Sequence, residues 1–368
     1  MLQILEQGII SRDESRAAFM PVITPLASGE WLACQHVGTA LASPDNDIEI
    51  LDSPDQGQTW NSRGTFRGTG SDDGFAYRGP EISELPDGRL LMSACRFHNE
   101  GTHLFDLETE ALERPELLLY WSEDRGHNWS DPQLLTIDAL PPEKYTANGA
   151  GRFLQLTEDR WLLFVETWKP TGYDGPPDQK AAFVVSTDQG RTWGDFTVVA
   201  DDTSGRLLYW DMMECVLPDD RIYTMFWTHL YGTKDDVNNH WSVSEDGGLS
   251  WSEPRPTNLP GQVCSPIPLP DGRVAAIYNH RHDPHGIHVA LSDDLETFDR
   301  DNEVVVFDAG AEAQLGETET DAFFEEHLLI GFGKPCGHYE PDTGTLLTYF
   351  WCTSGGITHT RWVRLGTL

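Results

Sequence analysis

The stretch Ser53-Pro54-Asp55-Gln56-Gly57-Gln58-Thr59-Trp60 is a polar turn that ends on a tryptophan. Close copies recur as SEDRGHNW at 122–129, STDQGRTW at 186–193, SEDGGLSW at 244–251 and a shortened SDDLETF at 292–298. The Ser and Asp side chains can bond nearby backbone amides, the glycine can take the left-handed conformation, and we expect the tryptophan to pack beneath the turn. Such repetition indicates a repeat architecture and a structural role for these aspartates.

A second repeat precedes the first along the chain. An apolar run, a tight polar turn and another apolar run occur six times, around Gly29, Gly88, Asp159, Asp220, Gly272 and Gly344. Each is predicted to be a β-hairpin, because β-forming residues flank a turn that supplies Asp or Gly. Five hairpins are followed by the SxDxGxTW-type turn, so one repeat reads as a four-stranded antiparallel meander. Six such sheets predict an all-β, six-bladed β-propeller that forms a single domain over residues 1–368.

The ends of the chain and one acidic segment complete this scheme. The last strand pair, near THTRWVRL, has no turn motif after it, and the N-terminal LQILEQGII is a plausible partner strand that closes the ring. Residues 299–332 are expected to be an insertion between blades five and six, as a long surface loop or an additional hairpin.

The charge balance argues against two classes of partner. The chain has 368 residues, with 25 Lys plus Arg against 60 Asp plus Glu and a formal net charge of -35. This excess of negative charge disfavours binding to nucleic acid or to an anionic membrane. An acidic shell of this kind is typical of a soluble protein or of a saline habitat.

The sequence also sets expectations for the cellular compartment. No stretch of about 18 apolar residues is present, which argues against a transmembrane helix. The start, MLQILEQGIISRDESR, lacks the basic and apolar regions of a secretory signal peptide. We therefore expect a cytoplasmic protein, or an extracytoplasmic one if a leader has been removed. Six scattered cysteines form no CxxC motif, and their apolar surroundings favour buried free thiols over disulfides.

The repeated SxDxGxTW motif is the Asp-box, or BNR repeat, and over nearly its whole length the chain resembles the sialidase (neuraminidase) superfamily. The resemblance implies an active site at the end of the axis where the inner strand of each blade begins. In that superfamily an arginine triad grips the substrate carboxylate, a Tyr and Glu pair provides the nucleophile, and an Asp is the acid/base.

The catalytic set of this chain diverges from that pattern. The first-arginine motif of the superfamily is replaced by Phe19-Met20-Pro21, and His36 stands at the position of the acid/base Asp. The stretch 333–336, GKPC, stands where the nucleophilic tyrosine is expected, and Asp211 replaces the Glu that activates it.

Polar residues at the expected mouths of the six blades are rich in His and Arg. The catalytic candidates among them are Asp211, His36, Glu166 and His229. The candidates for substrate binding are Arg78, Arg96, His98, His280, Arg281, Lys334, Trp210 and Trp227. Cations gathered at one rim of an acidic protein would attract an anionic ligand. We expect no metal or other cofactor, although the spacing in HRHDPHGIH at 280–288 also fits a metal site.

These features predict a glycan-active enzyme, an exo-glycosidase that releases a terminal acidic sugar. A mouth carboxylate and a histidine would act as acid and base, while arginines would hold the carboxylate of an anionic carbohydrate. Two alternatives stay open: a lyase that performs β-elimination on a uronic acid, and a non-catalytic carbohydrate-binding propeller whose tryptophans stack on sugar rings.

Overall fold

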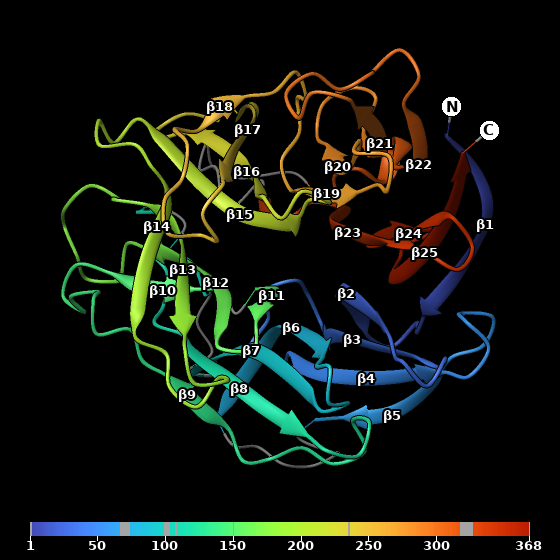
Figure 1. Ribbon diagram of the computed structural model, residues 1–368, viewed down its shortest axis with the longest axis horizontal. Helices are drawn as coiled ribbons and strands as arrows, with labels where there is room; N and C mark the ends of the chain where they lie inside the picture. Colours follow the sequence, from blue (N-terminus) through green and yellow to red (C-terminus); the bar gives the residue numbers. More distant parts are fainter. Residues whose placement is uncertain are drawn as a thin grey trace.

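The computed structural model describes residues 2–66, 74–98, 104–106, 109–149, 151–234, 236–316 and 327–367. Its strands form six antiparallel sheets arranged as blades around a central axis, and the two termini lie side by side (Figure 1). Five sheets have four strands, and the third has five because its inner strand is divided in two. The predicted all-β, six-bladed propeller is therefore confirmed.

Each blade runs from an inner strand at the axis to an outer strand at the rim. The first blade consists of β2 (Ala17–Pro25), β3 (Trp31–Gly38), β4 (Asp47–Ser53) and β5 (Asn61–Thr65). The second consists of β6 (Phe75–Glu84), β7 (Leu90–His98), β8 (Glu116–Ser122) and β9 (Gln133–Leu135). The third consists of β10 (Thr146–Asn148), β11 (Phe153–Thr157), β12 (Arg160–Trp168), β13 (Lys180–Ser186) and β14 (Asp195–Asp201).

The other three blades follow in chain order. The fourth consists of β15 (Leu207–Val216), β16 (Ile222–Leu230), β17 (Asp236–Ser244) and β18 (Arg255–Pro256). The fifth consists of β19 (Cys264–Pro268), β20 (Val274–His280), β21 (Gly286–Ser292) and β22 (Val304–Asp308). The sixth consists of β23 (Phe332–Glu340), β24 (Thr345–Ser354), β25 (Ile357–Thr367) and β1 (Leu2–Ser11).

The N-terminal strand closes the ring, as its sequence predicts. Strand β1 pairs antiparallel with β25, in a register that runs from Gln3 opposite Gly366 to Ser11 opposite Thr360. The first and last strands of the chain thus share one sheet, and the outer edge of β25 is paired rather than exposed.

The expected insertion at 299–332 is only partly an insertion. Strand β22 lies within it and forms the outer strand of blade five, pairing with β21. A short 3-10 helix, η1 (Gly310–Glu312), follows, and an isolated bridge joins Gln314 to Ile330. Residues 317–326 lie outside the described part of the chain. The prediction was wrong for residues 304–308, because the shortened turn at 292–298 leads into a fourth strand as the other copies do.

The repeated turns have the structure that their sequence predicts. In the first copy, Ser53 Oγ accepts a hydrogen bond from the Gly57 amide (2.7 Å), and Asp55 accepts from both the amide and the hydroxyl of Thr59 (2.8 and 2.7 Å). The copies at 122–129, 186–193 and 244–251 repeat these bonds. The glycine of each copy has a positive φ, and in the worn fifth copy Leu295 takes that conformation at 70°. The turns are structural staples between the third and fourth strands.

Hydrogen bonds between inner and second strands of successive blades support the apolar packing. Thr24 Oγ1 donates to the Ile82 carbonyl of the next blade (2.7 Å), and Ser93 Oγ donates to the Gly151 carbonyl of the blade after it (3.1 Å). All six cysteines are buried and free, as expected. Within the described ranges, no helix is long and apolar enough to cross a membrane.

Candidate active site

Four inner strands are interrupted at the same level by a residue in the left-handed conformation. These residues are Met20 (φ 50°), Gly79 (56°), Asp211 (47°) and Lys334 (43°), and each coincides with a shift in strand register. In blade three, Gly149 at φ 77° follows the end of β10. A left-handed backbone costs a residue other than glycine about 1–2 kcal/mol. Strain of this kind is concentrated at functional sites.

All five of these positions line one pocket at the axis, with a volume of about 680 Å³ including its mouth. The pocket takes its walls from the inner and second strands of several blades. Its ionisable lining groups include Arg78, Glu81, Glu166, Asp211 and Lys334. Residues from blades two, three, four and six therefore meet there, although they are far apart in the sequence.

Glu166, near the end of β12, is a buried carboxyl group with three hydrogen-bond donors. Its Oε1 accepts from Asn148 Nδ2 (2.9 Å) and Trp168 Nε1 (2.6 Å), and its Oε2 accepts from the backbone amide of Asp211 in the next blade (2.9 Å). Burial and the charge of Asp211 raise the pKa of Glu166 to about 7, against the opposing effect of these hydrogen bonds. Glu166 can therefore hold or release a proton near neutral pH.

The proton of neutral Glu166 has a preferred oxygen. Oε1 already accepts two hydrogen bonds, from Asn148 and Trp168, whereas Oε2 accepts one, from Asp211. A carboxyl oxygen has two lone pairs, so a proton on Oε1 would displace one of its donors. We therefore place the proton on Oε2, on the side of Asp211.

Asp211 and Lys334 form an ion pair across the pocket, with Nζ and Oδ1 2.9 Å apart. By the resemblance described above, Asp211 holds the position of the superfamily's activating Glu, and Lys334 lies in the stretch that replaces the nucleophilic tyrosine. These two positions are thus in contact here, but they hold an aspartate and a lysine in place of the glutamate and the tyrosine. Although burial opposes it, the charge of Asp211 raises the pKa of Lys334, which stays protonated.

Arg78 adds a second cation to the pocket wall. Its Nε is buried and has no hydrogen-bond partner among the residues described, and its guanidinium lies 6.0 Å from the centre of the Phe105 ring. Burial lowers the pKa of Arg78 to about 10, so the group is still charged at neutral pH. A buried charged donor without an acceptor is a plausible contact for an anionic or hydroxyl-bearing ligand.

Glu81 lines the pocket and interacts with two buried groups outside its lining, Glu214 and Arg152. Burial raises the pKa of Glu81, and it raises that of Glu214 to about 8, against the attraction of Arg152 in each case. Glu214 is fully buried, and neither of its oxygens has a partner in the described part of the chain. At neutral pH, Glu214 is therefore held mainly as the neutral acid.

Four predicted site residues, Glu166, Asp211, Arg78 and Lys334, share this pocket. The others lie outside its lining. His36 is fully buried, stacks on Phe19 with ring centres 5.4 Å apart and has its pKa held well below the usual range by burial. A neutral core imidazole of this kind replaces the predicted acid/base.

His229 and the two predicted tryptophans form a buried aromatic stack behind Glu166. Trp210 lies between Trp168 and His229, at 5.3 and 4.9 Å between ring centres, and Trp227 meets it edge-on at 4.9 Å. Trp210 and Trp227 are 2% and 3% exposed, so neither offers a face on which a sugar could stack. The prediction that they bind sugar was wrong because adjacent loops and strands bury them.

The remaining predicted residues lie in other parts of the fold. Arg96 pairs with Glu116 at 2.5 Å and lines a separate groove beside Trp129, while His98 at the end of β7 packs against Phe75. His280 and Arg281 belong to blade five, where buried His280 stacks on His288. Across the residues described, no three His, Cys, Asp or Glu side chains gather as metal ligands would.

Sequence reasoning missed Glu81 and Asn148, which both line the pocket. A signal was available for the first. A left-handed residue precedes proline in Met20-Pro21, Gly79-Pro80 and Lys334-Pro335, and this step marks the level of the pocket in blades one, two and six. Glu81 directly follows the second of these steps. No comparable pattern marks Asn148, because the inner strand of blade three is divided.

Comparisons with known proteins agree with this architecture. A protein of unknown function from Dyadobacter fermentans has 20% identity and a TM-score of 0.75, over 100% of this chain and 99% of its own. A Hadza microbial sialidase has 16% identity and a TM-score of 0.64, over 96% of this chain and 66% of its own. A Penicillium chrysogenum α-L-arabinanase complexed with arabinobiose has 13% identity and a TM-score of 0.66, over 98% of each chain.

At these identities the solved structures show a shared fold. None of the curated proteins matches the chain. The model of the BNR repeat-like domain matches residues 45–316, which is well over half of the sequence. The repeated turns, the six blades and this match together place the chain in the BNR repeat-like domain family.

Proposed function

We propose that this protein is a glycoside hydrolase that removes a terminal sugar from a glycan, with the pocket at the axis as its active site. Solved proteins that share its fold are named as a sialidase, an α-L-arabinanase and an α-L-arabinofuranosidase. The pocket, of about 680 Å³ including its mouth, lies at the end of the axis, which favours attack at the end of a glycan chain.

The observation that carries this proposal is the pair of carboxyl groups in the pocket with different environments. Glu166, with its pKa raised to about 7, is suited to protonate the leaving oxygen of a glycosidic bond through Oε2. Asp211, paired with Lys334, is suited to act as the carboxylate that attacks the anomeric carbon or activates a water there. Two carboxyl groups that differ in this way are what glycoside hydrolysis requires.

We further propose that the released sugar is acidic. The support is the buried guanidinium of Arg78, whose Nε lacks an acceptor among the described residues, together with Lys334 in the lining of the same pocket. A carboxylate on the sugar would supply the missing acceptor and would be favoured by the adjacent positive charge.

The test is a product assay with fluorogenic glycosides of N-acetylneuraminate, glucuronate, galacturonate and α-L-arabinofuranose, followed by mass spectrometry of the products from oligosaccharides with the same termini. We expect a free acidic sugar that has gained one water, and its release about 10²–10⁴-fold more slowly by the Glu166→Gln variant. Preference for the neutral arabinoside would overturn the acidic specificity only. An unsaturated uronate would make the protein a lyase, and binding without any product would make it a carbohydrate-binding propeller.

A further inference from the structure

We propose that Asp178, on the rim of blade three, is a positioning residue that clamps strand β10 so that Asn148 is held against Glu166. The inference rests on the proposed function for the role of Glu166, but the contacts that carry it do not depend on catalysis. Asp178 lies in the connection between β12 and β13, outside the lining of the pocket.

Strand β10 needs an anchor because it is short and isolated from the rest of its strand. It has three residues, Thr146 to Asn148, which pair with Trp168, Thr167 and Glu166 of β12. Gly149 follows in the left-handed conformation, and β11 begins only at Phe153. A ladder of three residues gives little stability by itself.

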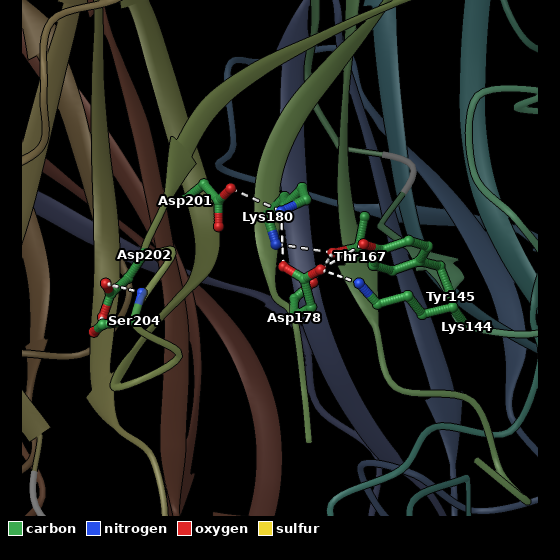
Figure 2. Close-up of polar contacts among 8 residues, drawn as sticks. All are labelled: Lys144, Tyr145, Thr167, Asp178, Lys180, Asp201, Asp202 and Ser204. Carbon is green, nitrogen blue, oxygen red and sulfur yellow. Dashed lines mark hydrogen bonds and ion pairs between the residues drawn. The ribbon is translucent and has the colours of Figure 1, made fainter. Parts of the chain in front are cut away.

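The side chains of the two residues that directly precede this strand donate hydrogen bonds to Asp178. Its Oδ2 accepts from Lys144 Nζ and from Tyr145 OH, both at 2.5 Å, and its Oδ1 accepts from Lys180 Nζ at 2.7 Å. Lys180 Nζ also binds Asp201 on β14 at 2.7 Å. Figure 2 shows Lys144, Tyr145 and Lys180 around the Asp178 carboxylate. Asp178 thus ties the start of β10 to β13 and β14.

The same connection also holds the strand that carries Glu166. Thr167 Oγ1 donates to the Asp178 carbonyl (3.0 Å) and accepts from the Lys180 amide (2.8 Å) (Figure 2). Thr167 lies between Glu166 and Trp168 in β12. The two side chains that bond Glu166 Oε1, Asn148 and Trp168, therefore both adjoin residues fixed by this connection.

The clamp is charged over the whole range in which Glu166 titrates. Although burial opposes it, hydrogen bonds from Lys144, Lys180 and Tyr145 hold the pKa of Asp178 well below its usual range. Exposed ion pairs alone contribute little to stability. A role in positioning therefore predicts an effect on Glu166 that a general loss of stability would not produce.

That effect is a change in the pKa of Glu166. The groups that face it are Asn148, Trp168 and the Asp211 amide, which favour the carboxylate, and the Asp211 charge, which disfavours it. Lys334 touches Asp211 and is unchanged by the clamp. Loosening β10 removes the Asn148 bond, so the pKa of Glu166 rises.

The experiment is titration of carboxyl-labelled glutamate by 13C NMR, with the Glu166 signal assigned from its loss in Glu166→Gln. We expect Asp178→Ala to raise the pKa of Glu166 by roughly 1–2 units, which is what one hydrogen bond to a carboxylate is worth. Asn148→Ala should give the same shift. The double variant should shift no further, because both changes remove one interaction.

Asp188→Ala is the matched control, because Asp188 is a half-buried aspartate of the same blade that, like Asp178, accepts several hydrogen bonds. It should leave the Glu166 titration unchanged. An unshifted Glu166 in folded Asp178→Ala, or additive shifts in the double variant, would overturn the proposal. If Asp178→Ala fails to fold, Tyr145→Phe removes one bond of the clamp and should give a smaller shift of the same sign.

These readouts separate the clamp from the proposed reaction. If the protein shows no turnover but Glu166 shifts as expected, the clamp stands and the hydrolase does not. If turnover is found, the pH at which the rate falls with rising pH should move upward in Asp178→Ala by the same amount as the NMR pKa.

Discussion

The two ends of the propeller axis use the same kinds of residue for opposite purposes. At one end, the aspartates of the repeated turns are exposed or half-buried, and local hydrogen bonds lower their pKa, to about 2 for Asp124 and Asp246. At the other end, the carboxyl groups of Glu166 and Glu214 are buried, and their pKa is raised to about 7 and about 8.

Left-handed residues other than glycine occur at both ends. Gln56, Arg125, Gln189 and Leu295 are in the repeated turns, whereas Met20, Asp211 and Lys334 are around the pocket. The register makes these opposite ends, because Ser53 pairs with Trp31, and Trp31 with Pro25 at the far end of β2 from Met20. The two ends therefore differ in how they treat their carboxyl groups and not in backbone strain.

The largest effect that this comparison predicts is on catalysis. Glu166→Gln keeps the shape of the side chain but removes its proton transfer, so turnover should fall by about 10²–10⁴-fold with little change in fold. The measurement is kcat on the substrate found in the product assay, with circular dichroism as a check. Glu158→Gln, an exposed glutamate at the turn end of the same blade, is the control. Full turnover by the Glu166→Gln variant would show that Glu166 is not the proton donor of the reaction.

The next effect is on the pH dependence of stability. Because the folded protein keeps a proton on Glu214 up to about pH 8 and the unfolded chain loses it near pH 4.5, folded stability is greatest below pH 4.5 for this group and is lost as the pH rises. Glu166 acts in the same direction up to about pH 7. The aspartates of the turns finish titrating below this window.

The buried histidines, whose lowered pKa acts in the opposite direction, finish titrating near pH 7. Thermal unfolding from pH 7 to pH 9 should therefore show a falling melting temperature, and Glu214→Gln should flatten the curve. Glutamine is neutral at every pH, so it removes this titration while filling the same space. An unchanged slope in the variant would mean that Glu214 is ionised in the folded protein.

A smaller effect is expected from the ion pair in the pocket. Lys334→Met leaves the Asp211 carboxylate without its cation, which costs about 3–5 kcal/mol in a fully buried pair. Since the Lys334 and Asp211 side chains are 17% and 31% exposed, we expect roughly 1–2 kcal/mol from urea unfolding after this discount. Adding Asp211→Asn should recover part of the loss. No recovery would indicate that the pair is not coupled in solution.

An effect on stability of similar size, without an effect on turnover, should come from the turn end. Ser186→Ala removes a buried acceptor of the Gly190 amide (2.8 Å) and should reduce stability by about 1–2 kcal/mol. Turnover of the folded variant should be unchanged, because no group of the pocket is touched. A Ser186→Ala variant that kept its stability but lost turnover would show that the turn end acts on catalysis and not on stability.

Parts of the site could be predicted from sequence and parts could not. Asp211 and Lys334 were found because they replace known positions of a related active site, and Glu166 and Arg78 because they stand at strand ends beside the expected mouth. His36, Trp210 and Trp227 occupy similar strand-end positions but are buried. A strand position defines the level along the axis, whereas the bulges and neighbouring loops decide which side chains reach the pocket.

The sequence by itself determined the architecture of this protein. Local turn chemistry repeats in SxDxGxTW, hairpins alternate with it, and the N-terminal strand has an apolar pattern that suits the last blade, so the blades follow from contacts between near neighbours in the chain. Only the tertiary structure decided the site, because its ion pair joins residues 123 positions apart and its pKa shifts come from burial that several blades create together. Such burial arises only when the blades close into a ring, so the sequence of a single repeat does not predict it.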